Sequence, residues 1–195
     1  MRLGIAIGTA GTLLLLGVTA CSGGNTVGDN SSTVASSSAP AAATTNPYGG
    51  PSIDPAGPDE PVLTVSGGST PLSLTLGDLK ALGEVSVTVD EPFVKKRQTF
   101  RGVPIAAVLA KAGIPDTATI ETVALNDYHY ASPVGPMVES QGLIATQRDG
   151  APIPYDQGGP IRIVYPDGTP LSQVLDAWNW SLASIIVVAP QPPAS

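Results

Sequence analysis

The stretch F-R-G-V-P-I-A-A-V-L-A-K-A-G, residues 100–113, predicts a helix that runs from Pro104 to Gly113. Proline suits the first turn of a helix, and glycine is the residue that most often stops one. Within this helix, apolar side chains fall at i, i+3, i+4 and i+7 and so make one apolar face; they belong to Ile105, Val108, Leu109 and Ala112.

Strand patterns surround this helix. Val85, Val87 and Val89 alternate with polar residues, which is the period of a half-buried strand. A second helix is expected to begin with Thr75 as its N-cap, because an acidic residue follows three positions later. Further strands are expected at 62–66, 119–125, 142–147, 161–165 and 182–188. Since strands outnumber helices, the fold class is expected to be α+β, mixed and strand-rich, in a domain over residues 61–189.

The residues before this domain have a different composition. Residues 1–20 combine one early basic residue with an uncharged apolar run, as in a secretory signal peptide. Val18-Thr19-Ala20-Cys21 resembles the lipobox of bacterial lipoproteins, which predicts lipidation of Cys21. Residues 21–60 are then a lipidated Cys followed by a disordered Ser/Ala/Gly/Pro linker, and 190–195 form a tail. The expected location is the outer face of the bacterial cytoplasmic membrane, with the membrane as a partner through the lipid on Cys21.

Composition excludes several classes of function. The chain has a net charge of −7 and only 13% charged residues. Nucleic acid is therefore not an expected partner, because lysine and arginine must replace the condensed counterions of the phosphates. One Cys and one His in 195 residues exclude zinc ribbons, disulfide scaffolds and iron–sulfur clusters.

Five motifs, taken in order, give the sequence a family resemblance. It resembles the sulfite oxidase-type molybdopterin-binding domain over residues 63–188, and especially the short, single-domain, exported bacterial members. The motifs are F-R-G-V-P-I (100–105), A-L-N-D-Y (124–128), G-L-I-A (142–145) with the turn at 149–150, G-G-P-I-R-I-V-Y-P (158–166) and W-N-W-S-L-A-S-I-I-V (178–187).

The resemblance implies a cofactor pocket, but the sequence differs from the catalytic members of the family at one important position. It implies that Asn126, Asp127 and Tyr128, together with the strand bearing Arg162, face the cofactor pocket. In catalytic members, a Cys near the end of the strand before the G-V-P helix ligates molybdenum. The corresponding stretch here, residues 85–93, contains no Cys. Because molybdenum in these enzymes needs a soft thiolate, no cofactor and no metal are expected, with molybdopterin as the alternative.

Arg162 and the tryptophans each allow two interpretations. Arg162 lies in an apolar strand, so its guanidinium must reach an anionic ligand or a carboxylate such as Asp127 or Asp156. Trp178 and Trp180 are two residues apart and would share one face of a strand. They either form a platform for a sugar or peptide, or pack into the core.

Three functions remain at this stage. The first is a membrane-anchored module that has lost its molybdenum ligand and binds a small anion or another partner, with no catalytic residues. The second is a molybdopterin-dependent oxidoreductase with atypical ligation of the metal. The third is a cell-surface scaffold that binds a protein partner.

Overall fold

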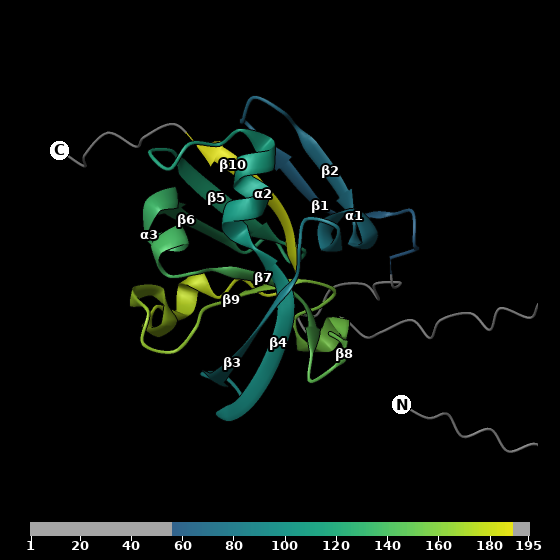
Figure 1. Cartoon of the computed structure of the whole chain (residues 1–195), viewed down its shortest axis with the longest axis vertical. Coiled ribbons are helices and arrows are strands. Elements are labelled where there is room, and N and C mark those ends of the chain that lie inside the picture. The colour runs from purple at the N-terminus through teal and green to yellow at the C-terminus, as the bar shows by residue number, and fades with distance from the viewer. Residues whose placement is uncertain (1–55, 189–195) are drawn as a thin grey trace, which may run out of the picture. The chain divides into compact units, whose positions relative to one another are not determined.

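The structure, a computed structural model, describes residues 56–188 (Figure 1). The expected signal peptide, Cys21, most of the linker and the tail lie outside these residues. None of the helices within 56–188 is long and apolar enough to cross a membrane. Strands dominate the described part, with three short α-helices and three 3₁₀ helices, so the expectation of a strand-rich α+β fold is confirmed.

The first sheet has five strands in the order β2-β1-β10-β5-β6. These are β1 (Pro61–Ser66), β2 (Leu72–Thr75), β5 (Thr119–Ala124), β6 (His129–Pro133) and β10 (Leu182–Val188). β1 and β10 are parallel, whereas the other neighbours are antiparallel. The first and last strands of the domain are therefore hydrogen-bonded to each other in the middle of this sheet.

The second sheet is built on a long hairpin. It contains β3 (Val85–Glu91), β4 (Lys96–Pro104), β7 (Leu143–Arg148) and β8 (Ala151–Pro152) in that order, and β9 (Arg162–Val164) also pairs with β7. In Figure 1 the β3–β4 ribbon extends well beyond the rest of this sheet. Its turn, residues 92–95, brings Phe93 to the site described below.

The helices connect and cover the strands. They are α1 (Leu76–Lys80), α2 (Ile105–Ala112) and α3 (Val134–Glu139), with 3₁₀ helices η1 (Tyr155–Gln157), η2 (Pro170–Gln173) and η3 (Leu175–Ala177). α1 begins at the expected N-cap: the Thr75 hydroxyl accepts the Asp78 amide, and the Asp78 carboxylate accepts the Thr75 amide. α2 ends at Gly113 in the left-handed conformation, and its expected apolar face is buried.

The motif F-R-G-V-P-I is mostly strand rather than helix. Phe100–Pro104 completes β4, and α2 begins only at Ile105. Gly102 lies where β4 crosses β7 at a break in register. A Cβ on Gly102 would lie 2.1 Å from the Ile144 carbonyl oxygen and 2.5 Å from the Ala145 Cα. The glycine in this motif therefore permits close contact between two backbones.

The side chain of Tyr165 is buried, and the effect of this burial on the pKa of its hydroxyl can be tested. Its side chain lies in the core, and its hydroxyl has no hydrogen-bond partner among the described residues. Burial, and secondarily the nearby Tyr130, raises the pKa of Tyr165 well above its ordinary value of 10.0. The folded state therefore holds this proton more tightly than the unfolded state does.

Replacing Tyr165 with phenylalanine is expected to have little effect at neutral pH and a clear effect in alkali. At pH 7 the change removes an unsatisfied buried hydroxyl, so the free energy of unfolding should change by less than about 1 kcal/mol. Above pH 10, stability of the wild type should fall by up to about 1.4 kcal/mol per pH unit from this group. Urea unfolding of both proteins from pH 7 to 11 measures the slope, and equal alkaline slopes would contradict the assignment.

Candidate functional site

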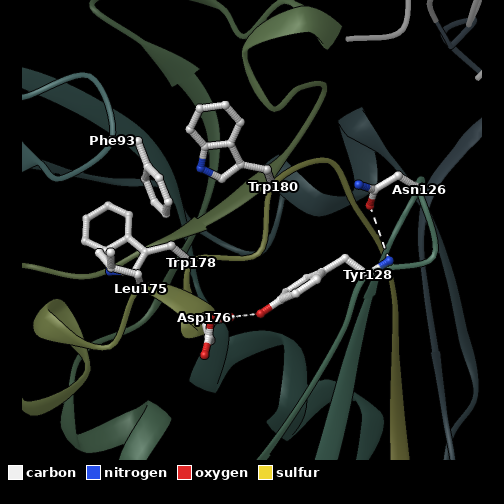
Figure 2. Close-up of a pocket in the computed structure, with 7 residues that line it drawn as sticks. All are labelled: Phe93, Asn126, Tyr128, Leu175, Asp176, Trp178 and Trp180. Atoms are coloured by element: carbon white, nitrogen blue, oxygen red, sulfur yellow. Dashed lines mark hydrogen bonds between the residues drawn. The ribbon is translucent and has the colours of Figure 1, made fainter. Parts of the chain in front are cut away.

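A cavity of about 360 Å³ lies where three separate segments meet. The β3–β4 turn supplies Phe93, the β5–β6 loop supplies Asn126 and Tyr128, and residues 175–180 supply the remaining side chains. Figure 2 shows all seven lining residues: Phe93, Asn126, Tyr128, Leu175, Asp176, Trp178 and Trp180. Four of the seven are aromatic, and neither lysine nor arginine is among them.

Phe93 and the two tryptophans form one aromatic wall. The Phe93 ring meets Trp180 edge to face, with ring centroids 5.2 Å apart, and meets Trp178 at 6.4 Å. Trp178 is 3% exposed and also contacts Tyr165 edge to face. Phe93, in contrast, is 44% exposed and so offers ring surface to a ligand. Trp178 therefore packs into the core as well as lining the cavity.

The loop with Asn126 and Tyr128 has a defined local structure. The Asn126 side-chain oxygen accepts the Tyr128 amide, and Asp127 between them has a φ of 60°. Asn and Asp tolerate such a turn because their short side chains bond to the local backbone. This geometry turns Tyr128 back over the cavity, where its hydroxyl donates to the Asp176 carbonyl at 3.1 Å (Figure 2). Burial, followed by the charge of Asp176, raises the pKa of Tyr128, so the hydroxyl remains a donor at neutral pH.

Arg162 and Glu91 form a buried ion pair beside this cavity. The guanidinium Nη2 lies 2.8 Å from Glu91 Oε1, and the two side chains are 2% and 0% exposed. The other carboxylate oxygen of Glu91 accepts the amides of Phe93 at 2.8 Å and Val94 at 2.7 Å. The same carboxylate therefore binds Arg162 and fixes the turn that carries Phe93.

Arg162 also supports the aromatic wall. Its guanidinium carbon lies 4.2 Å from the centre of the Trp180 ring, within the range of a cation–π contact. Arg162 itself is not among the lining residues, whereas Trp180 is. A carboxylate does pair with Arg162, as considered from the sequence, and it is Glu91, which the sequence analysis did not name.

Of the four residues expected to face the pocket, two line the cavity and two do not. Asn126 and Tyr128 line the cavity, and Asp127 belongs to the same loop but does not line it. Arg162 does not line it either, but contacts the ring of Trp180, which does. Sequence reasoning missed Phe93, Leu175, Asp176 and Glu91. The sequence carried one usable signal for Glu91: a buried strand arginine requires a carboxylate, and Glu91 ends a valine-rich strand of the same sheet.

Two donors near the cavity lack acceptors. The indole nitrogens of Trp178 and Trp180 are buried and have no hydrogen-bond partner within residues 56–188. A buried N–H without an acceptor costs about 1–3 kcal/mol. The Asn126 amide adds a third donor to the same cavity.

The fold and the cavity together define a strand-rich α+β domain with a mainly aromatic cavity at the sheet ends. The chain matches the family described as "Oxidoreductase molybdopterin binding domain" over residues 50–174. It therefore belongs to that family, as the sequence resemblance indicated.

One solved structure with a similar fold is the sulfane dehydrogenase SoxCD from Paracoccus pantotrophus. Its TM-score is 0.56 at 17% sequence identity, and the match covers 69% of this chain and 39% of that one. This level of identity supports the fold alone. No curated protein matches the chain.

The family match corrects the expectation about cofactors. The absence of a thiolate led to the prediction that no cofactor is bound, but the family that the chain belongs to is one of molybdopterin-binding domains. Molybdopterin, kept as the alternative from the sequence, is the cofactor that the comparison favours.

The residues of the cavity fit one part of this cofactor. The aromatic walls and the Asn126 amide suit a flat ring that carries acceptor atoms, as a pterin does. The part of the cofactor that carries the metal has no matching set of protein ligands in the described residues. Residues 56–188 include no cluster of three or more His, Cys, Asp or Glu that could hold a metal ion. The single Cys of the chain is residue 21. The site therefore fits the organic ring and lacks a thiolate for molybdenum.

Proposed function

We propose that this chain is a lipid-anchored, extracytoplasmic binding domain whose cavity receives the flat ring of a molybdopterin-type molecule. The mainly aromatic lining of the cavity, which includes Phe93, Tyr128 and Trp180, is the observation that carries this proposal. Phe93 and Tyr128 would contact the faces of the ring, and the Asn126 amide would bond to its edge. When bound, molybdopterin supplies redox chemistry through its metal, whereas these residues bind and orient.

The anionic ligand expected from Arg162 has weaker support than the ring. Glu91 already compensates the charge of Arg162, and no basic side chain lines the cavity. The cavity is therefore better suited to a flat ring than to a small anion.

An oxidoreductase with atypical ligation remains the second candidate, because family membership favours it. The two proposals differ in the metal. Elemental analysis of protein from cofactor-producing cells should find far less than one molybdenum per chain for a binding domain. Close to one molybdenum per chain would instead favour the oxidoreductase. A scaffold protein would show neither metal nor bound ring.

Binding of a soluble pterin is expected to quench the tryptophan fluorescence of the domain. Replacing Tyr128, which is 39% exposed, with alanine removes one aromatic surface and should weaken biopterin binding about tenfold, the upper end for one aromatic contact. The control is Val85→Ala, which shortens another exposed apolar side chain that does not line this cavity. If biopterin does not bind the wild type, or binds Tyr128→Ala equally well, the cavity is not the site.

Anchoring to the membrane is the second part of the proposal, and it rests on the V-T-A-C sequence at 18–21. Lipid chains on one Cys supply the two membrane signals that stable anchoring requires. Replacing Cys21 with alanine should abolish fatty-acid labelling and leave an unprocessed precursor, while the melting temperature of the domain stays unchanged. Continued labelling of the alanine variant would refute lipidation at Cys21.

A further inference from the structure

We infer that the segment just before the described domain, residues 51–55, docks into a second cavity of this domain through Ile53. The occupant of that cavity is thus a part of the same chain. The second cavity shares no lining residue with the aromatic cavity described above. Docking of the segment is therefore independent of ring binding.

The second cavity is almost wholly apolar. Its volume is about 360 Å³, and its walls are the first described residues (56–58), the starts of β1 and α1, residues 152–155 and Pro160. Among the described residues that line it, four are prolines, and only Tyr155 has a polar side-chain group. An aliphatic side chain gains most from such a cavity, because burial of apolar surface is favourable in proportion to its area.

The chain leaves the described residues at the wall of this cavity. The Tyr155 hydroxyl accepts the Ala56 amide at 3.0 Å, and Tyr155 itself is only 8% exposed. The next residues form a closed turn, in which the Glu60 carboxylate accepts the Gly57 amide at 3.1 Å and the Glu60 amide donates to the Gly57 carbonyl. Ala56 and Gly57 both line the cavity, so the segment that precedes them starts beside it.

The sequence of this segment contains one side chain that suits the cavity. Residues 51–55 read P-S-I-D-P, and Ile53 is the one branched aliphatic residue between Val34 and Val62. Ile53 comes three residues before Ala56, so the Cα atoms of the two lie within about 11 Å of each other. The cavity is therefore within reach of Ile53.

The backbone of this segment is also suited to docking. A residue that precedes proline favours an extended conformation, and Asp54 precedes Pro55. Neighbouring side chains of an extended chain point to opposite sides, so Asp54 stays in water while Ile53 is buried. Aromatic-lined grooves are known to receive extended, proline-containing segments. The family match agrees with this placement, because it begins at residue 50, before β1 begins at Pro61.

Thermal unfolding of the full chain, purified in detergent, provides the test. Ile53→Ala removes most of the docked side chain and is expected to lower the melting temperature by about 5 °C, as for a partly buried aliphatic side chain in a domain of this size. The matched control is Val34→Ala, which makes a similar change in the expected linker, farther from the cavity in sequence. This control should melt at the wild-type temperature.

A double variant tests whether Ile53 occupies this particular cavity. Leu76 is half-buried and lines the cavity. Substitutions of two residues in contact are not additive, so Ile53→Ala and Leu76→Ala together should lower the melting temperature by at least about 2 °C less than the sum of their separate effects. Val34→Ala combined with Leu76→Ala should be additive.

The outcomes that overturn the docking are distinct. If Ile53→Ala melts at the same temperature as Val34→Ala, the segment does not dock, and this comparison decides the matter even if Leu76→Ala does not fold. If Ile53→Ala is destabilised but additive with Leu76→Ala, Ile53 does not occupy this cavity. A melting temperature that rises with protein concentration and is unchanged in Ile53→Ala would assign the cavity to a second copy of the chain.

Discussion

Replacing Arg162 with alanine is expected to lower the free energy of unfolding by about 3–5 kcal/mol. The change leaves the Glu91 carboxylate buried without its cation, and breaking a buried pair from one side costs about this much. It also removes a long side chain from beneath Trp180. For a domain of this size, the melting temperature should fall by about 10 °C or more. Thermal unfolding followed by circular dichroism measures both quantities.

An exposed arginine of the β3–β4 hairpin provides the control. Arg97 pairs with Asp90 at 3.1 Å and with Asp167 at 3.2 Å, but its side chain is 59% exposed. Water and salt screen such pairs, so Arg97→Ala should cost less than about 1 kcal/mol. If the two arginine variants melt at the same temperature, the buried Glu91–Arg162 pair does not stabilise the domain more than the exposed pairs of Arg97 do.

Replacing Gly102 with alanine is expected to destabilise the domain by about 3 kcal/mol or more. The new methyl group would lie 2.1 Å from the Ile144 carbonyl oxygen, which is backbone and cannot rotate away. β4 and β7 would have to separate at the centre of the second sheet, so the cost should reach the upper end for overpacking. Urea unfolding at 25 °C measures the difference.

Gly77→Ala tests whether the loss of stability expected for Gly102→Ala comes from the close contact at Gly102 or from replacing any glycine with alanine. Gly77 is exposed in α1, and a Cβ there would come no closer than 3.6 Å to the Thr75 hydroxyl. Alanine favours a helix over glycine by about 1 kcal/mol, so this variant should be as stable as the wild type or more so. Equal stability losses in both variants would contradict the contact between β4 and β7.

Local patterns predicted much of the fold. The alternation of Val85, Val87 and Val89 predicted β3, and the spacing of apolar residues predicted α2. The capping box at Thr75 predicted the start of α1. Each of these signals acts over a few residues, so the sequence shows it directly.

The candidate site was less predictable because it depends on contacts between distant segments. Asn126 and Tyr128 were found through a family motif, whereas Phe93 reaches the cavity only because the β3–β4 hairpin extends to it. Glu91 and Arg162 are 71 residues apart, and no local pattern specifies their pairing. β6 was missed because its five residues, H-Y-A-S-P, alternate too weakly in hydrophobicity to indicate a strand.

The parallel pairing of β1 with β10 has a consequence for the order of folding. The first strand of the domain cannot complete its pairing until the last strand has been made, because β10 is the central strand of that sheet. A nascent chain that emerges with its amino end first therefore holds β1 with one open edge through most of its synthesis. Contacts between such distant segments form late and slowly. The first sheet is consequently completed only after the whole domain has been synthesised.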